Sequence, residues 1–111
     1  MKLVNLELNR PTVPAAVSLL ADALRSARES EFLGVKFIHG YGSSGVGGDI
    51  RIAVQKTLAQ KLAAREIRAF IAGEDWRISN EFSWELLKRC PELKQDSDLG
   101  RANRGITIVV F

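Results

Sequence analysis

Segments with strand-like and helix-like periodicity alternate along this chain, and this alternation is the feature that most constrains its fold. Residues 2–8 alternate between polar and apolar side chains, which is typical of a strand with one buried face. Apolar residues within 13–30 recur at steps of three and four, which predicts a helix with one apolar stripe. The same pair of patterns follows again, with a short buried strand over 35–38 and a helical stripe over 50–62.

The second half of the chain continues the alternation with a shorter helix. We expect a third strand over 67–72, a short helix over 84–89 that Pro91 stops, and a β-branched final strand over 106–111. Strands that alternate with helices indicate an α/β fold. We therefore predict an α/β two-layer sandwich, a mixed four-stranded sheet with two main helices and one short extra helix. The helical crossovers predict that the sheet is largely parallel at its centre.

Composition restricts the class of protein. The 111 residues are one domain's worth, so we predict a single domain over 1–111, and 46% hydrophobic with 26% charged residues is typical of a folded protein. No apolar run approaches the ~20 residues of a membrane span, and the N-terminal residues lack a signal-peptide core. Cys90 is the single cysteine, which favours a reducing, cytoplasmic location. The net charge of +3 is compatible with a polyanionic partner without requiring one.

The most informative local motif is a glycine-rich loop between the second strand and the second helix. It runs from His39 to Gly48, and Asp49 is the expected helix cap. Glycines let a backbone approach a ligand closely, and the amides of a helix N-terminus attract anions. Arg51 would add a positive charge, and arginines before the last strand could reach the same anion if that strand lies beside the second. The candidate nucleic-acid or anion ligands are Gly40, Gly42, Ser43, Ser44, Gly45, Gly47, Gly48, Arg51, Arg101 and Arg104. The alternative is a loop without a ligand.

The loop does not match either common nucleotide-binding motif. A P-loop ends in Gly-Lys-Ser/Thr, whereas Gly48 is followed by Asp49 and Ile50. Residues 40–45 have the spacing of a dinucleotide fingerprint, but they follow the second strand, and no acid ends the third strand. Nucleotide binding of these types is therefore not expected.

His39 is the only histidine of the chain. With Cys90 as its only soft companion, it cannot complete a zinc site from histidine and cysteine. It is expected at the carboxyl end of a strand, where ligands of α/β sheets usually bind. The alternative is a histidine that is hydrogen-bonded to the backbone of the loop.

Three segments together resemble the Smr (small MutS-related) domain family. Residues 38–42, Ile-His-Gly-Tyr-Gly, are similar to the H-G-x-G signature of that family. Residues 6–9, Leu-Glu-Leu-Asn, fall where the family carries L-D-x-H, and Gly105 with Thr107 resembles its closing glycine-threonine strand. The order of elements agrees as well, so the resemblance covers nearly the whole chain.

The resemblance implies a nucleic-acid-binding domain, often with nicking or endonuclease activity on DNA or RNA and sometimes with a divalent metal ion. His39 and Glu7 would be the catalytic, acid–base residues. Glu7 stands where the family has Asp, and Asn9 stands where many members have His, which removes a group that titrates near neutral pH. These departures leave the binding inference unchanged and weaken the nuclease inference. The alternative function is a non-catalytic module that binds a partner protein or a small anion through the loop.

The long stretch from Glu74 to Asn103 is the other departure from the family pattern. Its aromatic residues could stack on nucleic-acid bases, but packing of the small helix onto the sheet explains them as well, and we expect packing for Trp76, Phe82 and Trp84. Cys90, at the end of the expected short helix, is predicted to be a small buried residue. The sequence leaves the oligomeric state open.

Overall fold

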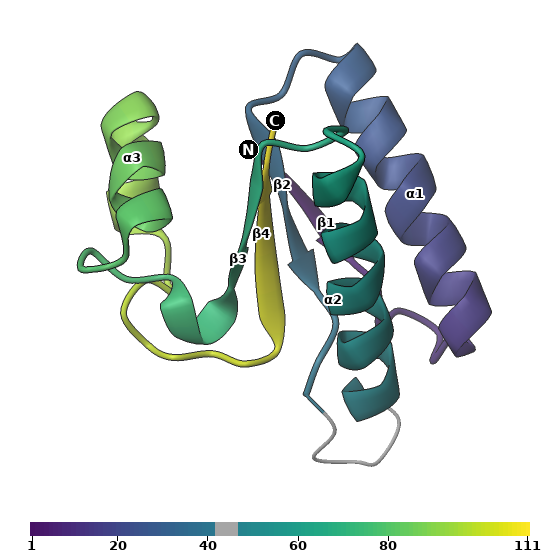
Figure 1. The fold of residues 1–111 in the computed structure, drawn as a ribbon. Coiled ribbons are helices and arrows are strands. Elements are labelled where there is room, and N and C mark those ends of the chain that lie inside the picture. The colour runs from purple at the N-terminus through teal and green to yellow at the C-terminus, as the bar shows by residue number, and fades with distance from the viewer. Residues whose placement is uncertain (42–46) are drawn as a thin grey trace.

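The computed structural model describes residues 1–41 and 47–111 and contains four strands and three α-helices (Figure 1). The elements follow one another as β1 (Lys2–Asn5), α1 (Val13–Glu29), β2 (Gly34–Ile38), α2 (Gly47–Ala63), β3 (Ala69–Ala72), η1 (Gly73–Asp75), α3 (Glu81–Arg89), η2 (Pro91–Gln95) and β4 (Ile106–Val110). The fold is the expected α/β sandwich with a mixed four-stranded sheet, so the predicted class is confirmed. None of the described helices is long and apolar enough to cross a membrane.

The strands lie in the order β1-β2-β4-β3. β1 and β2 are parallel, whereas β4 is antiparallel to both of its neighbours, β2 and β3. The expectation of a largely parallel centre is therefore wrong. β3 ends and β4 begins at the same end of the sheet, so β4 runs in the opposite direction to β3. It lies between β3 and β2 and is antiparallel to both. The final strand does lie beside the second.

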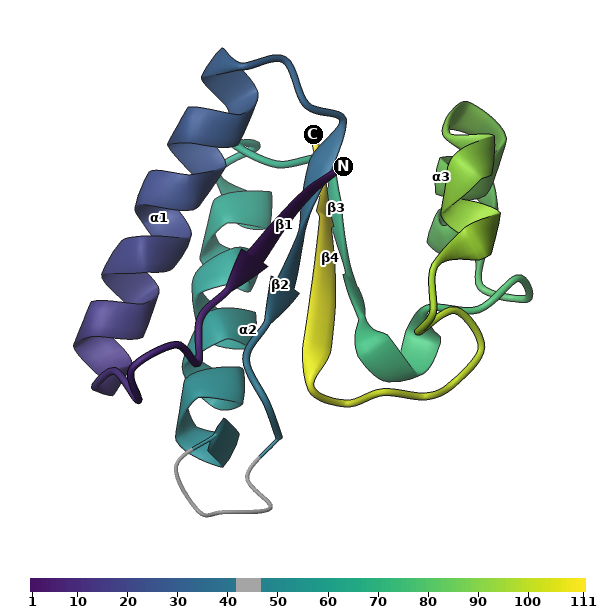
Figure 2. The ribbon, with the colours of Figure 1, turned by 180° about the vertical axis from the view of Figure 1, so that it is seen from behind.

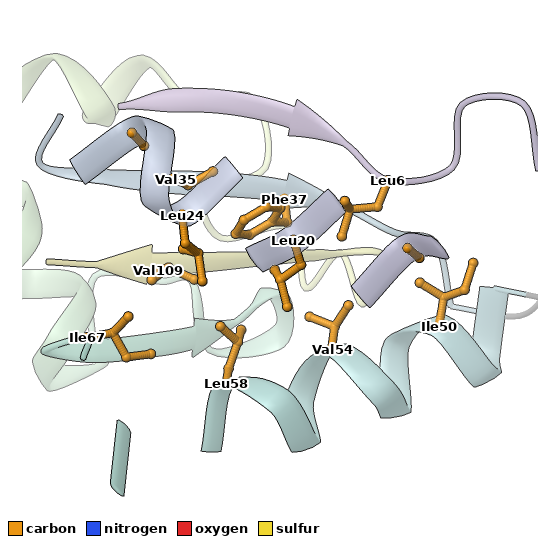
Figure 3. Packing of buried hydrophobic residues seen from close by; sticks show 12 residues of the cluster. Leu6, Leu20, Leu24, Val35, Phe37, Ile50, Val54, Leu58, Ile67 and Val109 are labelled. Carbon is orange, nitrogen blue, oxygen red and sulfur yellow. The ribbon is translucent and has the colours of Figure 1, made fainter. Parts of the chain in front are cut away.

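Helices α1 and α2 lie side by side on one face of the sheet (Figures 1 and 2). Thr12 caps α1 by accepting a hydrogen bond from the Ala15 amide at 3.3 Å, as the sequence indicates. The core between these helices and the sheet is built from both predicted helical stripes and from alternate strand residues (Figure 3). Its members include Leu20, Leu24, Val35, Phe37, Val54, Leu58 and Val109.

The segment between β3 and β4 covers part of the opposite face. Figures 1 and 2 show α3 on the side of the sheet away from α1 and α2. Trp76, Leu86 and Leu87 pack there in a second apolar cluster with Ile71 and Ile108 of the strands. Trp76 is fully buried and Cys90 is buried, which confirms packing for both. Phe82 and Trp84 differ from the expectation, because each keeps about half of its surface exposed, 51% and 47%.

A buried network of charges ties this second layer to the sheet. Lys36 of β2 points away from α1 and α2, and its Nζ donates to Asp96 at 2.9 Å and to Asp98 at 2.6 Å. Asp96 also accepts from the Trp76 indole at 3.2 Å, and Asp98 accepts from the Asn103 amide at 2.9 Å. The second Asp96 carboxylate oxygen lies 3.1 Å from Nζ, so the Lys36 ammonium has three carboxylate acceptors in the segment that leads into β4.

Several element boundaries differ from the sequence prediction. β1 ends at Asn5, because Asn9 and Arg10 adopt left-handed backbone angles that turn the chain, and Leu8 is 64% exposed. α2 begins at Gly47, so Asp49 lies within its first turn. α3 begins at Glu81, where the Asn80 side chain caps it by accepting from the Ser83 amide at 3.0 Å.

Candidate functional site

One edge of the sheet brings together most of the described candidate residues. The carboxyl ends of β1, β2 and β3 meet there, and β4 starts from the same edge (Figure 1). The first turn of α2 lies at this edge as well. Glu7 follows β1, His39 follows β2, Glu74 lies in η1 after β3, and Arg104 precedes β4. We call this region the sheet-edge site, with Glu7, His39, Arg51, Glu74 and Arg104 as its charged or titratable members.

His39 is fully buried, and both of its ring nitrogens have partners. Nδ1 lies 2.6 Å from the Gly40 carbonyl oxygen, and Nε2 lies 2.8 Å from Thr107 Oγ1. A carbonyl can only accept, so the neutral ring donates from Nδ1 and accepts the Thr107 hydroxyl proton at Nε2. Burial lowers the pKa of His39, and the nearby charge of Arg51 lowers it further, against opposing effects of the Gly40 carbonyl, Glu7 and Glu74. His39 is thus a neutral, hydrogen-bonded core residue in this conformation.

The backbone around His39 is held closely against the start of β4. The amides of His39 and Gly40 both donate to the Gly105 carbonyl, at 2.9 and 3.1 Å. Gly40 has a φ of +73°, and a Cβ at this position would collide with the Glu7 carboxylate. Glycine is therefore favoured at this residue by its left-handed conformation, and a Cβ would in addition require the exposed Glu7 side chain to move.

Glu7 is exposed and lies against Gly40, next in sequence to His39. Its side chain contributes to the electrostatic environment of His39, but the described contacts include no hydrogen bond between the two. The catalytic roles of His39 and Glu7 stay predictions. Catalysis by His39 has one geometric requirement: Nε2, which holds the only lone pair of the neutral ring, must first release the Thr107 hydroxyl before it can accept a proton from a substrate.

Arg51 and Arg104 come from separate elements and meet at one carboxylate. Arg51 Nη2 donates to Glu74 Oε2 at 3.1 Å and to Oε1 at 3.3 Å, and Arg104 Nε lies 3.6 Å from Oε2. The Nε of Arg51 is buried and has no acceptor among the described residues. A buried guanidinium donor without an acceptor is energetically costly, which distinguishes this arginine from the other described ones.

The remaining candidate ligands fall into three groups: residues of α2, an exposed arginine, and residues outside the described part of the chain. Gly47 and Gly48 are the first two residues of α2, and Arg51 is its fifth. Arg101 is exposed, and its side chain forms no ion pair or hydrogen bond with the parts of the chain that the structure describes. The predicted ligands Gly42, Ser43, Ser44 and Gly45 lie outside the described residues.

Sequence reasoning missed Glu74 and the partner role of Thr107. A signal for Glu74 existed, because it comes two residues after the third strand, at the same edge as His39. Thr107 sits inside an apolar strand, and only the pairing of β4 with β2 shows that it faces a histidine.

The described residues do not fit a divalent metal ion at this edge. Over residues 1–41 and 47–111, no group of three or more histidine, cysteine, aspartate or glutamate side chains is arranged to hold one. Glu7 is a single carboxylate, and Glu74 is already bound by Arg51. We therefore derive no chemical step through a metal ion.

Comparisons with known proteins add no assignment. The chain matches no model of a known protein family, no curated protein and no solved structure.

Proposed function

We propose that this chain is a nucleic-acid-binding domain of the Smr type, and that Arg51 and Arg104 bind backbone phosphate at the sheet-edge site. The observation that carries the proposal is the convergence of these two guanidinium groups on Glu74. A carboxylate and a phosphate present similar planar pairs of acceptor oxygens to arginine. A phosphate that displaces Glu74 would accept from both arginines and could also reach the buried Nε of Arg51.

The surroundings of the two arginines support an anion. Arg51 is the fifth residue of α2, close to the helix N-terminus, and the amides of a helix N-terminus carry positive dipole character. The sequence resemblance to Smr domains implies the same ligand class. The single cysteine, Cys90, is compatible with the reducing cytoplasm, which is the location we propose.

We propose nucleic-acid binding; cleavage is a separate prediction, which rests on the resemblance to Smr domains. Neutral His39 has no lone pair free for a substrate proton, because Nε2 accepts from Thr107. Incubation with supercoiled plasmid and with structured RNA, each with and without Mg²⁺, tests cleavage directly. His39→Gln is the matched variant, and its nicking rate should fall to background if His39 is the base.

Binding is tested by fluorescence anisotropy with labelled oligonucleotides at increasing salt. One neutralised phosphate predicts a slope of log affinity against log salt of about −0.7 for a single strand. Affinity should then fall ~2.6-fold between 50 and 200 mM salt. Arg51→Gln and Arg104→Gln should each weaken binding and bring the slope closer to zero.

The matched control is Arg68→Gln, which removes one positive charge from an exposed ion pair with Glu85. Arg68 precedes β3, so it lies at the end of that strand opposite to the sheet-edge site. It should leave both affinity and slope nearly unchanged. Equal losses in all three variants would mean that only net charge matters, and the sheet-edge site would not be the phosphate site. Binding of inorganic phosphate or of a protein partner, without oligonucleotide binding, would favour the alternative module.

A further inference from the structure

Tyr41 is an exposed aromatic residue at the sheet-edge site that the phosphate contacts leave unused. Its side chain is 55% exposed, although it directly follows the buried His39 and the tightly placed Gly40. A half-exposed aromatic ring beside a phosphate site offers a face on which a nucleic-acid base can stack.

The backbone beneath Tyr41 holds its ring over the start of β4. The left-handed φ of Gly40, +73°, redirects the chain at the end of β2. The amide of Gly40 donates to the Gly105 carbonyl at 3.1 Å, which ties the turn to β4. A Cβ at Gly105 would lie 3.4 Å from Tyr41 Cδ1, so the ring lies close against this glycine. Tyr41 is therefore placed before any ligand arrives, with much of its ring open to solvent.

The position of Tyr41 relative to the arginines is the second observation. Gly105 is the immediate neighbour of Arg104, and consecutive Cα atoms are only about 3.8 Å apart. The Tyr41 ring thus lies against the residue next to Arg104. Two other half-exposed aromatic residues, Phe82 and Trp84, are on α3, which covers the face of the sheet opposite to α1 and α2.

We propose that Tyr41 stacks on a nucleobase of the strand whose phosphate Arg51 and Arg104 bind, and that the ligand is single-stranded nucleic acid. This inference rests on the proposed function. An aromatic ring beside a phosphate contact can stack only on a base whose face is open. In a duplex the base faces are covered by neighbouring base pairs, whereas unpaired bases can turn onto a protein ring.

The affinity test compares a short oligouridine, the corresponding oligothymidine and a duplex of the same length. Single strands should bind more tightly than the duplex. Tyr41→Ala should weaken single-strand binding roughly 5- to 150-fold, which is the range for loss of one base–aromatic stack. Tyr41→Phe keeps the ring and should retain most of the affinity. Phe82→Ala removes an aromatic side chain of similar exposure, 51%, and should have no effect.

A spectroscopic test uses the fact that Tyr41 is the only tyrosine of the chain. Replacement by 3-fluorotyrosine gives one fluorine NMR signal that reports on this ring alone. The ring current of a stacked base should shift that signal upfield when oligouridine is added. Inorganic phosphate, which binds without a base, should leave it nearly in place.

The two proposals fail in different ways. If Arg104→Gln weakens oligouridine binding but Tyr41→Ala does not, and the fluorine signal stays unchanged, stacking is wrong while phosphate binding stands. If the duplex binds as tightly as the single strand, the single-strand assignment is wrong. If no oligonucleotide binds, the proposed function itself is overturned and the stacking proposal falls with it.

Discussion

Replacing Lys36 by methionine should destabilise the fold and disorganise the segment that carries Arg104. Lys36 Nζ has two carboxylate partners, Asp96 and Asp98, and its side chain is only 11% exposed. Methionine keeps most of the length and apolar volume of the lysine stem but removes the charge. Two poorly solvated carboxylates would then face each other without a counter-ion.

The expected loss of unfolding free energy is about 3 kcal/mol at neutral pH. Removal of one partner from a buried ion pair costs about 3–5 kcal/mol. The low end applies because Asp96 and Asp98 keep 14% and 21% exposure, and because Trp76 and Asn103 still donate to them. At roughly 4 °C per kcal/mol, Tm should fall by about 12 °C.

The pH dependence gives this prediction a second readout. Burial opposes the charge of Lys36, but its hydrogen bonds to Asp98 and Asp96 outweigh burial and raise the Lys36 pKa above 10.5. Burial likewise opposes the charge of Asp98, but hydrogen bonds from Asn103 and Lys36 lower the Asp98 pKa below 3.8. The network therefore stabilises the fold between these limits and loses its effect as pH falls through the Asp98 pKa or rises through the Lys36 pKa. The deficit of Lys36→Met should shrink in acid.

Urea unfolding followed by circular dichroism, at neutral and at acidic pH, measures both effects. Lys61→Met is the matched control, because Lys61 pairs with Glu66 at an exposed position and should cost under ~1 kcal/mol. Arg104-dependent oligonucleotide binding should weaken in Lys36→Met as well. The reasoning is refuted if Lys36→Met is as stable as Lys61→Met, or if its deficit is the same at both pH values.

Three further predictions concern the sheet-edge site. Glu74→Gln removes the carboxylate that competes with phosphate, so oligonucleotide affinity measured by anisotropy should rise about two- to fivefold. The control is Glu85→Gln, which should have little effect because Glu85 pairs with Arg68 outside the site. The lowered pKa of His39 means that the fold prefers the neutral ring, so unfolding free energy should be highest above pH ~6.5 and fall as pH drops below it. Since the chain has one histidine, His39→Gln should abolish that slope between pH 5 and 6.5 in urea titrations. A Cβ at Gly73 would collide with a backbone carbonyl in the turn before β4, so Gly73→Ala should lower Tm more than Gly100→Ala does. At Gly100 the added Cβ meets open space, and only the left-handed φ is strained.

The sequence by itself predicted the helices and their buried faces well. Leu20, Leu24, Val54 and Leu58 are buried where the stripes placed them, because helical periodicity is a local property that three or four turns already display. The same locality explains the placement of His39 at the end of β2. The strand and the following glycines are adjacent in sequence, so no long-range contact was needed to find them.

Only the tertiary structure decided the pairing of β4 and the partners that this pairing creates. The pattern of residues 106–111 indicates a buried strand, but it is the same whether that strand runs parallel or antiparallel to its neighbours. The antiparallel position between β2 and β3 places Thr107 against His39, and it brings the turn with Arg104 to Glu74 and Arg51. Strand pairing and ion pairing between distant residues depend on hydrogen bonds and contacts formed only when the chain closes on itself. The composition of the site was therefore partly visible in the sequence, whereas its geometry was not.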